Sequence, residues 1–386
     1  MKDISIYFKP LEIDTSLMSE ESLGKTVHFH TEDNFPEIAA NGVAIFYSPE
    51  FRNGELALHG ETDDHFREHL WNLFPGPSWN FEVYDLGTIL PGGSIQDTYF
   101  AITQVTAELV KKNVIPVLIG GTQDLTFPFY QAYQQLEQTV NLVSIDSRFD
   151  LGTPDDEISK DGYLSRILMH RPCFLFNHST IGIQMPFVKQ AEMDLFEKLY
   201  FDACRLGEFN ADFKLAEPLL RNADIMSLDL QSIRYSDFQG DHYTSPNGFY
   251  ADQICQIARY AGISDKMTSF GIFNLLPGNI SAASSHLVAQ IIWYFMDGIA
   301  QRKGDFPIGS KKDYLKFIVH MDSYENDLIF YKSHKSERWW MEVPYPPRSG
   351  VKFERHHMVP CNYEDYQLAM QNEMPDLWWR TYQKLS

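Results

Sequence analysis

Two short apolar runs, each leading into a cluster of polar residues, constrain the fold of this chain more than any other feature. The run VIPVLIGG (114–121) stops at a glycine pair and continues as TQD, and the run VNLVSID (140–146) continues as SRFD. Short runs rich in Val, Ile and Leu that are bounded by turn residues are typical of buried strands. Aspartates at strand ends also supply the oxygen ligands that hard metal ions prefer. The two runs therefore raise the question of a metal site at one edge of a sheet.

Segments with strand character alternate with segments of helical spacing over most of the chain. The strand-like segments are 42–48, 114–121, 140–146, 178–184, 223–230 and 267–277, and the helical ones are 97–113, 126–138, 251–262 and 284–302. This alternation predicts an α/β fold with three α/β/α layers, in which crossover helices cover both faces of a mainly parallel sheet. Ligands bind beyond the carboxyl ends of the strands in such sheets. We therefore expect GGTQD, DSRFD and DLQSIR, which all follow strands, to converge.

The composition of the sequence changes after Arg302, where a polar stretch with Pro and Gly begins. We predict a body over residues 1–302 and a C-terminal extension over 303–386 that packs on or next to it. Residues 314–322 and 327–333 alternate like strands, and 363–385 reads as one final helix. The extension is rich in aromatic residues and contains two tryptophan pairs, at 339–340 and 378–379. Such pairs favour anchoring of the extension on the body, and the alternative is a surface that binds a sugar or a partner.

Composition restricts the classes of partner and compartment. The 386 residues are 44% hydrophobic and 14% aromatic, enough for a substantial core, and the formal net charge is −20. So acidic a chain, with no basic stripe, is expected to bind neither nucleic acid nor anionic membranes. Four scattered cysteines (Cys173, Cys204, Cys255 and Cys361) form no CxxC pair, and no run of eighteen apolar residues occurs. We expect a soluble cytoplasmic protein with reduced thiols.

The three strand-end motifs, in this order and spacing, resemble those of the arginase/agmatinase/formimidoylglutamase (ureohydrolase) family. Stretches at family-like places extend the resemblance over roughly residues 35–300: YDLGTI (84–89), IGIQ (181–184), SPNGFYADQI (245–254) and IFNLLP (272–277). The resemblance implies an arginase-like fold and a homo-oligomer. In active members it also implies two Mn²⁺ ions, whose bridging hydroxide hydrolyses guanidino or formimidoyl groups.

At the positions of the family's metal ligands, only the aspartates are kept. Asp146, Asp150 and Asp229 match family ligands, whereas the other three positions carry Gln123, Arg148 and Gln231. By the resemblance, Gln123 and Arg148 replace histidines and Gln231 replaces an aspartate.

The substrate pocket departs from the family in the same way. A family glutamate that binds the substrate's guanidinium falls on Asn274, and another expected histidine has no counterpart nearer than Ser165. Both changes remove groups that the resemblance would assign to an active enzyme.

These departures leave three interpretations of the site open. A guanidinium has no lone pair to donate, so Arg148 cannot be a ligand and disables one half of a two-metal site. Arg148 could instead be the counter-cation, bridging two of the three carboxylates of Asp146, Asp150 and Asp229 in a metal-free cluster, which is our leading expectation. The second interpretation is one divalent ion (Mn²⁺, Mg²⁺ or Ca²⁺) on Asp146, Asp150 and Asp229. The third is a working two-metal site.

The functional expectation follows from the missing ligands. We expect a ureohydrolase-fold protein without two-manganese hydrolase activity and without a cofactor, acting as a scaffold or as a binder of a small molecule or protein that the sequence does not identify. The alternative is a divergent hydrolase of linear C–N bonds in amidines or guanidines, similar to formimidoylglutamase or agmatinase and using one metal.

Overall fold

A computed structural model describes residues 3–54, 64–152, 158–239, 245–276, 280–307, 311–322, 324, 326–345 and 356–385. Its largest element is a ten-stranded sheet in the order β1-β4-β3-β5-β10-β9-β6-β7-β8, with β2 also paired to β4. The strands are β1 (Phe8–Lys9), β2 (His28–Phe29), β3 (Val43–Tyr47), β4 (Val83–Ile89), β5 (Ile115–Ile119), β6 (Val140–Ile145), β7 (Leu175–Ile183), β8 (Asp202–Arg205), β9 (Ile225–Asp229) and β10 (Ser269–Phe273). All pairings in this sheet are parallel except that of β1 with β4.

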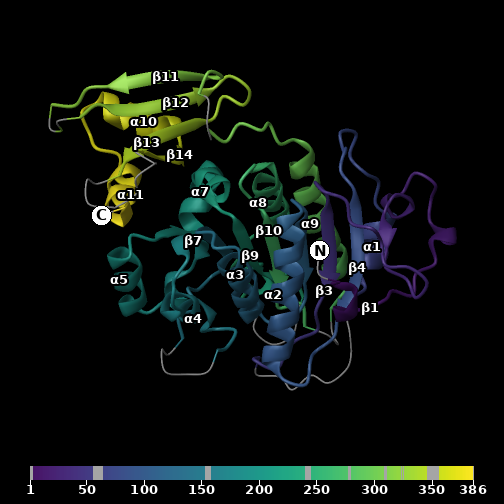
Figure 1. Cartoon of the computed structure of the whole chain (residues 1–386). Coiled ribbons are helices and arrows are strands. Elements are labelled where there is room, and N and C mark those ends of the chain that lie inside the picture. The colour runs from purple at the N-terminus through teal and green to yellow at the C-terminus, as the bar shows by residue number, and fades with distance from the viewer. Residues whose placement is uncertain are drawn as a thin grey trace.

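Helices cover both faces of this sheet, which confirms the predicted three-layer α/β/α fold (Figure 1). One hydrophobic cluster joins one face of the sheet to α1 (Phe66–Asn72), α6 (Leu206–Ala211), α7 (Ala216–Asn222), α8 (Ala251–Ile263) and α9 (Ala282–Ala300). A second cluster joins the other face to α2 (Ile95–Lys111), α3 (Thr126–Gln135), α4 (Tyr163–Met169) and α5 (Gln190–Lys198). The central strands are buried along their whole length because both of their faces carry helices.

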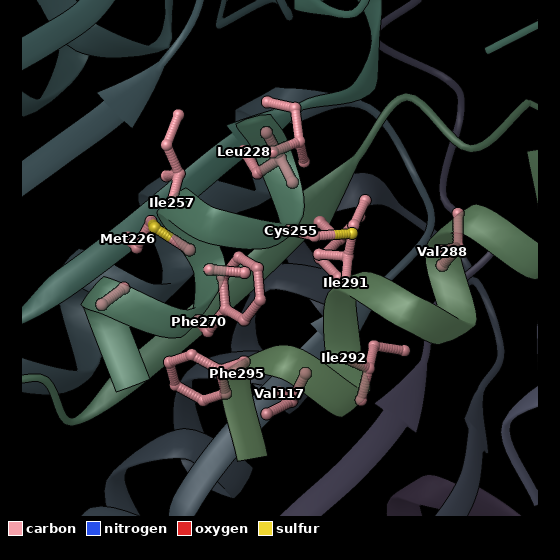
Figure 2. Packing of buried hydrophobic residues seen from close by; sticks show 14 of the residues in the cluster. Val117, Met226, Leu228, Cys255, Ile257, Phe270, Val288, Ile291, Ile292 and Phe295 are labelled. Atoms are coloured by element: carbon pink, nitrogen blue, oxygen red, sulfur yellow. The ribbon is translucent and has the colours of Figure 1, made fainter. Parts of the chain in front are cut away.

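The packing of α8 and α9 on the central strands is shown in Figure 2, where Ile257 and Phe295 lie near Met226 and Phe270. The rings of Phe270 and Phe295 have centroids 4.7 Å apart. This apolar layer fixes the strands and therefore also fixes the loops that follow them.

The C-terminal extension contains a separate antiparallel sheet in the order β11-β12-β13-β14. Its elements are β11 (Tyr314–Val319), β12 (Leu328–Ser333), β13 (Trp339–Pro344), β14 (His356–Cys361), α10 (Tyr363–Met370) and α11 (Asp376–Leu385). The prediction of a single helix over 363–385 was wrong: Pro375 precedes α11, and proline disfavours a helical conformation for the residue before it. Trp339, Trp340 and Trp378 are buried and Trp379 is half-exposed, so most of these rings are used in packing.

The extension is held to the body by buried polar contacts. The Arg221 guanidinium of α7 donates to the carbonyls of Trp339 and Cys361, at 3.0 Å each, and lies 4.7 Å from the Trp340 ring centroid. On α11, Arg380 pairs with Asp202 at 3.3 Å. The contact is therefore specific rather than a loose tether. Among the described segments, no helix has the length and apolar character needed to cross a membrane.

Candidate functional site

The polar motifs meet at the carboxyl ends of four strands that are neighbours in the main sheet. β5, β10, β9 and β6 lie side by side in that order, and each is followed by one of the motifs identified in the sequence. The expected convergence of GGTQD, DSRFD and DLQSIR is therefore what the topology produces, and the loop after β10 adds Asn274.

Gly120 and Gly121 allow the loop after β5 to approach its neighbours closely. Both have positive φ, at 92° and 66°. A Cβ on Gly120 would lie 2.1 Å from the Tyr47 ring, and one on Gly121 would lie 2.9 Å from the Glu50 carbonyl. Any larger residue would push this loop away from the strand ends.

Asp229 and Asn274 form the tightest contact of the site. The Asn274 side-chain amide donates to Asp229 Oδ1 at 2.7 Å, and the Gln231 backbone N–H donates to the same oxygen at 2.8 Å. Asn274 also donates its backbone N–H to the Gly121 carbonyl at 2.7 Å. Its side chain thus turns toward a neighbouring carboxylate, and its Oδ1 is buried without a donor among the described residues.

Asp146 and Asp150 lie close together after β6. Asp146 Oδ1 accepts the backbone N–H of Arg148 at 2.9 Å, and the side chains of Asp150 and Gln123 favour the ionised form of Asp146. The neighbouring Asp150 carboxyl can donate a hydrogen bond to Asp146 only when it carries a proton. Asp150 has φ 50°, a left-handed conformation that aspartate tolerates better than most residues.

The expectation that the Arg148 guanidinium bridges these carboxylates was wrong. The Arg148 side chain is exposed, and its guanidinium lies over the Phe187 ring, 5.3 Å from the centroid. Among the described residues, which include Asp146, Asp150 and Asp229, no ion pair joins its guanidinium to any of the three carboxylates. The backbone of Arg148 turns toward Asp146, so its side chain projects outward, where its charge only modestly favours ionised Asp146.

The remaining predicted residues are less central. Gln123 is buried, its amide donates at 3.3 Å to both Tyr163 Oη and Ser227 Oγ, and it also favours the ionised form of Asp146. Gln231 and Ser165 are half-buried, and the hydrogen bond of Gln231 to this site comes from its backbone. Gln123 is therefore held as a structural amide in its present conformation.

Burial makes the three aspartates unusually weak acids. Burial raises the pKa of Asp150 well above its usual range, and the charges of Asp146 and Asp229 raise it further. Burial also raises the pKa of Asp146, and it raises that of Asp229 to about 8 with a contribution from Asp146. Three carboxyl groups so close together cannot all ionise without a compensating cation, and the site therefore holds protons near neutral pH.

Two residues near the carboxylates were not identified from the sequence. The Lys160 side chain is 12% exposed, and its charge favours the ionised form of Asp229. Tyr163 is buried, which raises its pKa, and it lies close enough to Asp150 and Asp146 for their charges to raise the pKa further; it shares a hydrogen bond of 2.9 Å with Ser144. Neither residue lies in a motif, and no local pattern distinguishes Lys160 from a surface lysine.

A third missed residue, Asp124, anchors a separate buried cluster beside the site. It is fully buried and accepts hydrogen bonds from Thr122, Tyr99 and, at 2.9 Å, Asn53. Burial raises its pKa to about 6 despite these three donors. These contacts hold the loop after β5 in place, and the Asp124 carboxylate accepts its hydrogen bonds from within the protein.

The residues present do not fit a two-manganese centre. Arg148 points outward and has no lone pair, the Gln123 amide donates hydrogen bonds within the protein, and the motifs supply no imidazole, the ligand type that suits transition metals. Over the ranges that the structure describes, no three His, Cys, Asp or Glu groups are arranged to hold a metal ion. The buried side-chain oxygens of Asp146 and Asn274 are nevertheless acceptors of the kind that a hard cation uses.

The weak acidity of Asp229 predicts an unusual dependence of stability on pH. A folded-state pKa of about 8, above the model-compound value of 3.8, means that the folded protein binds an extra proton between these values. The stabilising contribution of the protonated Asp229 carboxyl is then fully present below about pH 4 and is lost as pH rises through about 8. Asp229→Asn keeps the Oδ1 acceptor without the charge. We expect its unfolding free energy to exceed that of the wild type by on the order of 3 kcal/mol at pH 8, and by little near pH 4.

Urea unfolding of both proteins at several pH values, in the presence of a chelator, checks this expectation. Asp97→Asn serves as a control of opposite sign, because hydrogen bonds from Ser94 lower the pKa of Asp97. A gap between Asp229→Asn and wild type that does not widen with pH would contradict an uncompensated carboxyl at this position.

Comparison with known sequences identifies the family of the chain. The family model described as "Arginase family" matches residues 59–297. A formimidoylglutamase of Geobacillus sp. (strain WCH70) is 23% identical over 209 residues, which cover 50% of this chain and 63% of the relative. The match thus spans less than two thirds of that relative's length.

Solved structures of low sequence identity share the fold. A formimidoylglutamase from Bacillus subtilis aligns with a TM-score of 0.66 at 15% identity, covering 76% of this chain and 96% of that one. A formiminoglutamase from Trypanosoma cruzi with Mn²⁺ aligns with a TM-score of 0.61 at 17% identity, covering 68% and 94%. An agmatine ureohydrolase of Thermoplasma volcanium gives 0.56 at 16%, covering 74% and 96%. At these identities the likeness concerns the fold alone.

Proposed function

The chain belongs to the arginase family, and from this premise we propose that it binds a ligand or partner at the strand ends without two-manganese hydrolysis of guanidino or formimidoyl groups. The observation that carries the proposal is the outward Arg148 at a ligand position, with its guanidinium over Phe187. Hydrolysis by a metal-bound hydroxide needs a cation that lowers the pKa of water. The chain's own residues instead stabilise protons on Asp150 and Asp229.

The chemistry of such a site suits binding rather than nucleophile generation. Protonated carboxyls can donate hydrogen bonds to a ligand, and the Asp146 and Asn274 side-chain oxygens can accept hydrogen bonds from one. A ligand that offers an N–H or O–H group would satisfy Asn274 Oδ1, which otherwise stays unpaired at a cost of about 1–3 kcal/mol. The identity of that ligand, small molecule or protein, is not fixed by these groups.

A one-metal hydrolase of linear C–N bonds is the second candidate function, and one observation favours it. The two buried acceptors lie beside Asp229 and Asp150, so four oxygen donors come from neighbouring strand ends. A single Mg²⁺, Ca²⁺ or Mn²⁺ on Asp146, Asp150 and Asp229 would keep these carboxyls ionised and could bind the water that attacks an amidine carbon.

Metal analysis and activity assays separate the two functions. Protein purified with excess Mn²⁺ and then dialysed is expected to retain far less than one equivalent of Mn. It is also expected to release no formamide or urea above background from formimidoylglutamate, agmatine or arginine. The Bacillus subtilis formimidoylglutamase, assayed in parallel, is the positive control. Stoichiometric metal with turnover at ordinary enzyme rates, about 1 s⁻¹ or more, would refute the proposal.

We also propose, from the family resemblance, that the protein is a homo-oligomer in the cytoplasm. Light scattering at micromolar concentration gives the assembly state. A monomer would remove the support for this part of the proposal without affecting the assignment of the site.

A further inference from the structure

The interface between the extension and the body encloses a small cavity next to a histidine. The cavity has a volume of about 30 Å³, room for about one water molecule, and its walls come from β7, β8, α7, β14 and α11. His357 of β14 lines it, with its ring centroid 5.1 Å from that of Phe176 and 6.3 Å from that of Tyr345. The Nε2 atom of His357 is buried and has no hydrogen-bond partner among the described residues. At this edge the imidazole is therefore packed like an apolar ring.

Helix α11 places two cations beside this histidine. Lys384 and Arg380 line the same cavity, and the charge of Lys384 disfavours a proton on His357. Asp202 of β8 also lines the cavity, and its carboxylate pairs with Arg380 at 3.3 Å. The carboxylate on this side of the cavity therefore already has a cationic partner.

The charged groups on the other side of His357 are paired as well. Lys266, which precedes β10, also disfavours a proton on His357, and it pairs with Asp224 at 3.1 Å. On α7, Arg221 pairs with Glu217 at 3.1 Å and donates to a carbonyl of β14. Among the described residues, a proton on His357 would thus add a buried positive charge without a free carboxylate to balance it, which is costly.

The affinity of His357 for a proton consequently differs between the packed and the exposed state. Burial, together with the charges of Lys266 and Lys384, lowers the pKa of His357 to about 4, whereas an exposed imidazole has a pKa of about 6.5. The packed form therefore has its full stability above about pH 6.5 and loses it as pH falls toward about 4. The ratio of separated to packed forms should rise roughly twentyfold between pH 7 and pH 5.

We propose that the contact between the extension and the body is a pH-sensitive switch, which opens at mildly acidic pH when His357 takes up a proton and turns to solvent. The extension and the body have separate hydrophobic clusters, so both can stay folded when the contact opens. Opening would uncover Asp202 and Asn177 at the end of the main sheet, where β8 is the last strand. The switch does not depend on the strand-end aspartates.

A second buried histidine allows release of the extension to be separated from general unfolding. The ring centroid of His178, in β7, lies 5.6 Å from that of Phe196 and 5.8 Å from that of Phe201, and burial lowers its pKa to about 3. Both phenylalanines belong to the body, so His178 stays covered when the extension leaves. A proton on His178 would therefore loosen the body as a whole, whereas a proton on His357 opens the interface alone.

Hydrogen exchange of the full chain, followed by mass spectrometry and corrected for the intrinsic effect of pH, tests the switch. In the wild type, protection of α11 and β8 should fall roughly twentyfold between pH 7 and pH 5, while protection of α8 and α9 stays constant. His357→Phe keeps a ring at this position but cannot take up a proton, so the same segments should change by less than about threefold. His320→Asn, which alters an exposed histidine of the extension, is the matched control and should respond like the wild type.

Three results would overturn the proposal. One is a wild type without the fall at α11, and another is a fall in His357→Phe as large as that of the wild type. The third is an equal fall in α8 and α9, because it would indicate acid unfolding of the body through groups such as His178. His357→Gln, which also lacks a titrating side chain, gives the same comparison if His357→Phe does not fold.

Discussion

A triple variant, Gln123→His, Arg148→His and Gln231→Asp, is expected to change metal binding at the strand ends more than any other substitution. It would add two imidazoles and one carboxylate and remove a guanidinium, which together restore the ligand types of the family pattern. We expect the wild type to retain almost no Mn²⁺ after dialysis and the variant to retain close to two ions, with affinity raised by about a thousandfold or more. Elemental analysis and calorimetry measure both quantities.

A single variant separates the effect of removing the Arg148 charge from the effect of adding metal ligands. Arg148→Met removes the positive charge without adding a ligand, so it should leave Mn²⁺ binding close to that of the wild type. If the triple variant folds, as judged by circular dichroism, and still binds no Mn²⁺, these positions are not the family's ligand positions in space. Hydrolysis is expected to stay low even in the triple variant, because Asn274 and Ser165 also depart from the family pattern.

Arg221→Met is expected to produce the largest loss of stability. The Arg221 guanidinium is buried, donates to two carbonyls of the extension, stacks on Trp340 and pairs with Glu217 at 3.1 Å. Its removal leaves the two carbonyls without this donor, and Glu217 keeps only its pairing with Arg338 at 3.3 Å among the described residues. We expect a loss of about 3–5 kcal/mol in unfolding free energy.

Urea denaturation followed by tryptophan fluorescence suits this test, because Trp339, Trp340 and Trp378 lie in the affected region. Arg171→Met is the matched control. That arginine is exposed and bonds only to nearby carbonyls of its own chain segment, so its loss should change stability by less than about 0.5 kcal/mol. A similar small effect for Arg221→Met would mean that the extension does not depend on this contact.

The main sheet and the convergence of its strand-end motifs were predictable from the sequence. β5 and β6 are short, mostly apolar and fully buried, and α9 is long and has helical spacing, so length and periodicity were enough to identify them. The break before α11 also had a signal, Pro375, which the aromatic pattern on both sides of it outweighed.

The direction of individual side chains was not predictable. Arg148 shares its loop with two aspartates, yet the turn made by its backbone N–H sends the guanidinium outward to Phe187. Lys160 and Arg221 depend on partners that are distant in the chain, and Arg221 reaches Cys361 across 140 residues. A motif fixes which residues are neighbours in the chain, whereas these contacts depend on how separate loops pack.

The seam between the two sheets has a consequence for any shortened form of the protein. β8 is the last strand of the main sheet, and α11 lies beside its start, where Arg380 pairs with Asp202 and Lys384 donates to Asn177 of β7. A fragment ending near residue 302 would leave Asp202 and Asn177, at this end of the main sheet, without these partners. Open strand edges invite pairing with other molecules. We therefore expect such a fragment to self-associate more readily than the full chain.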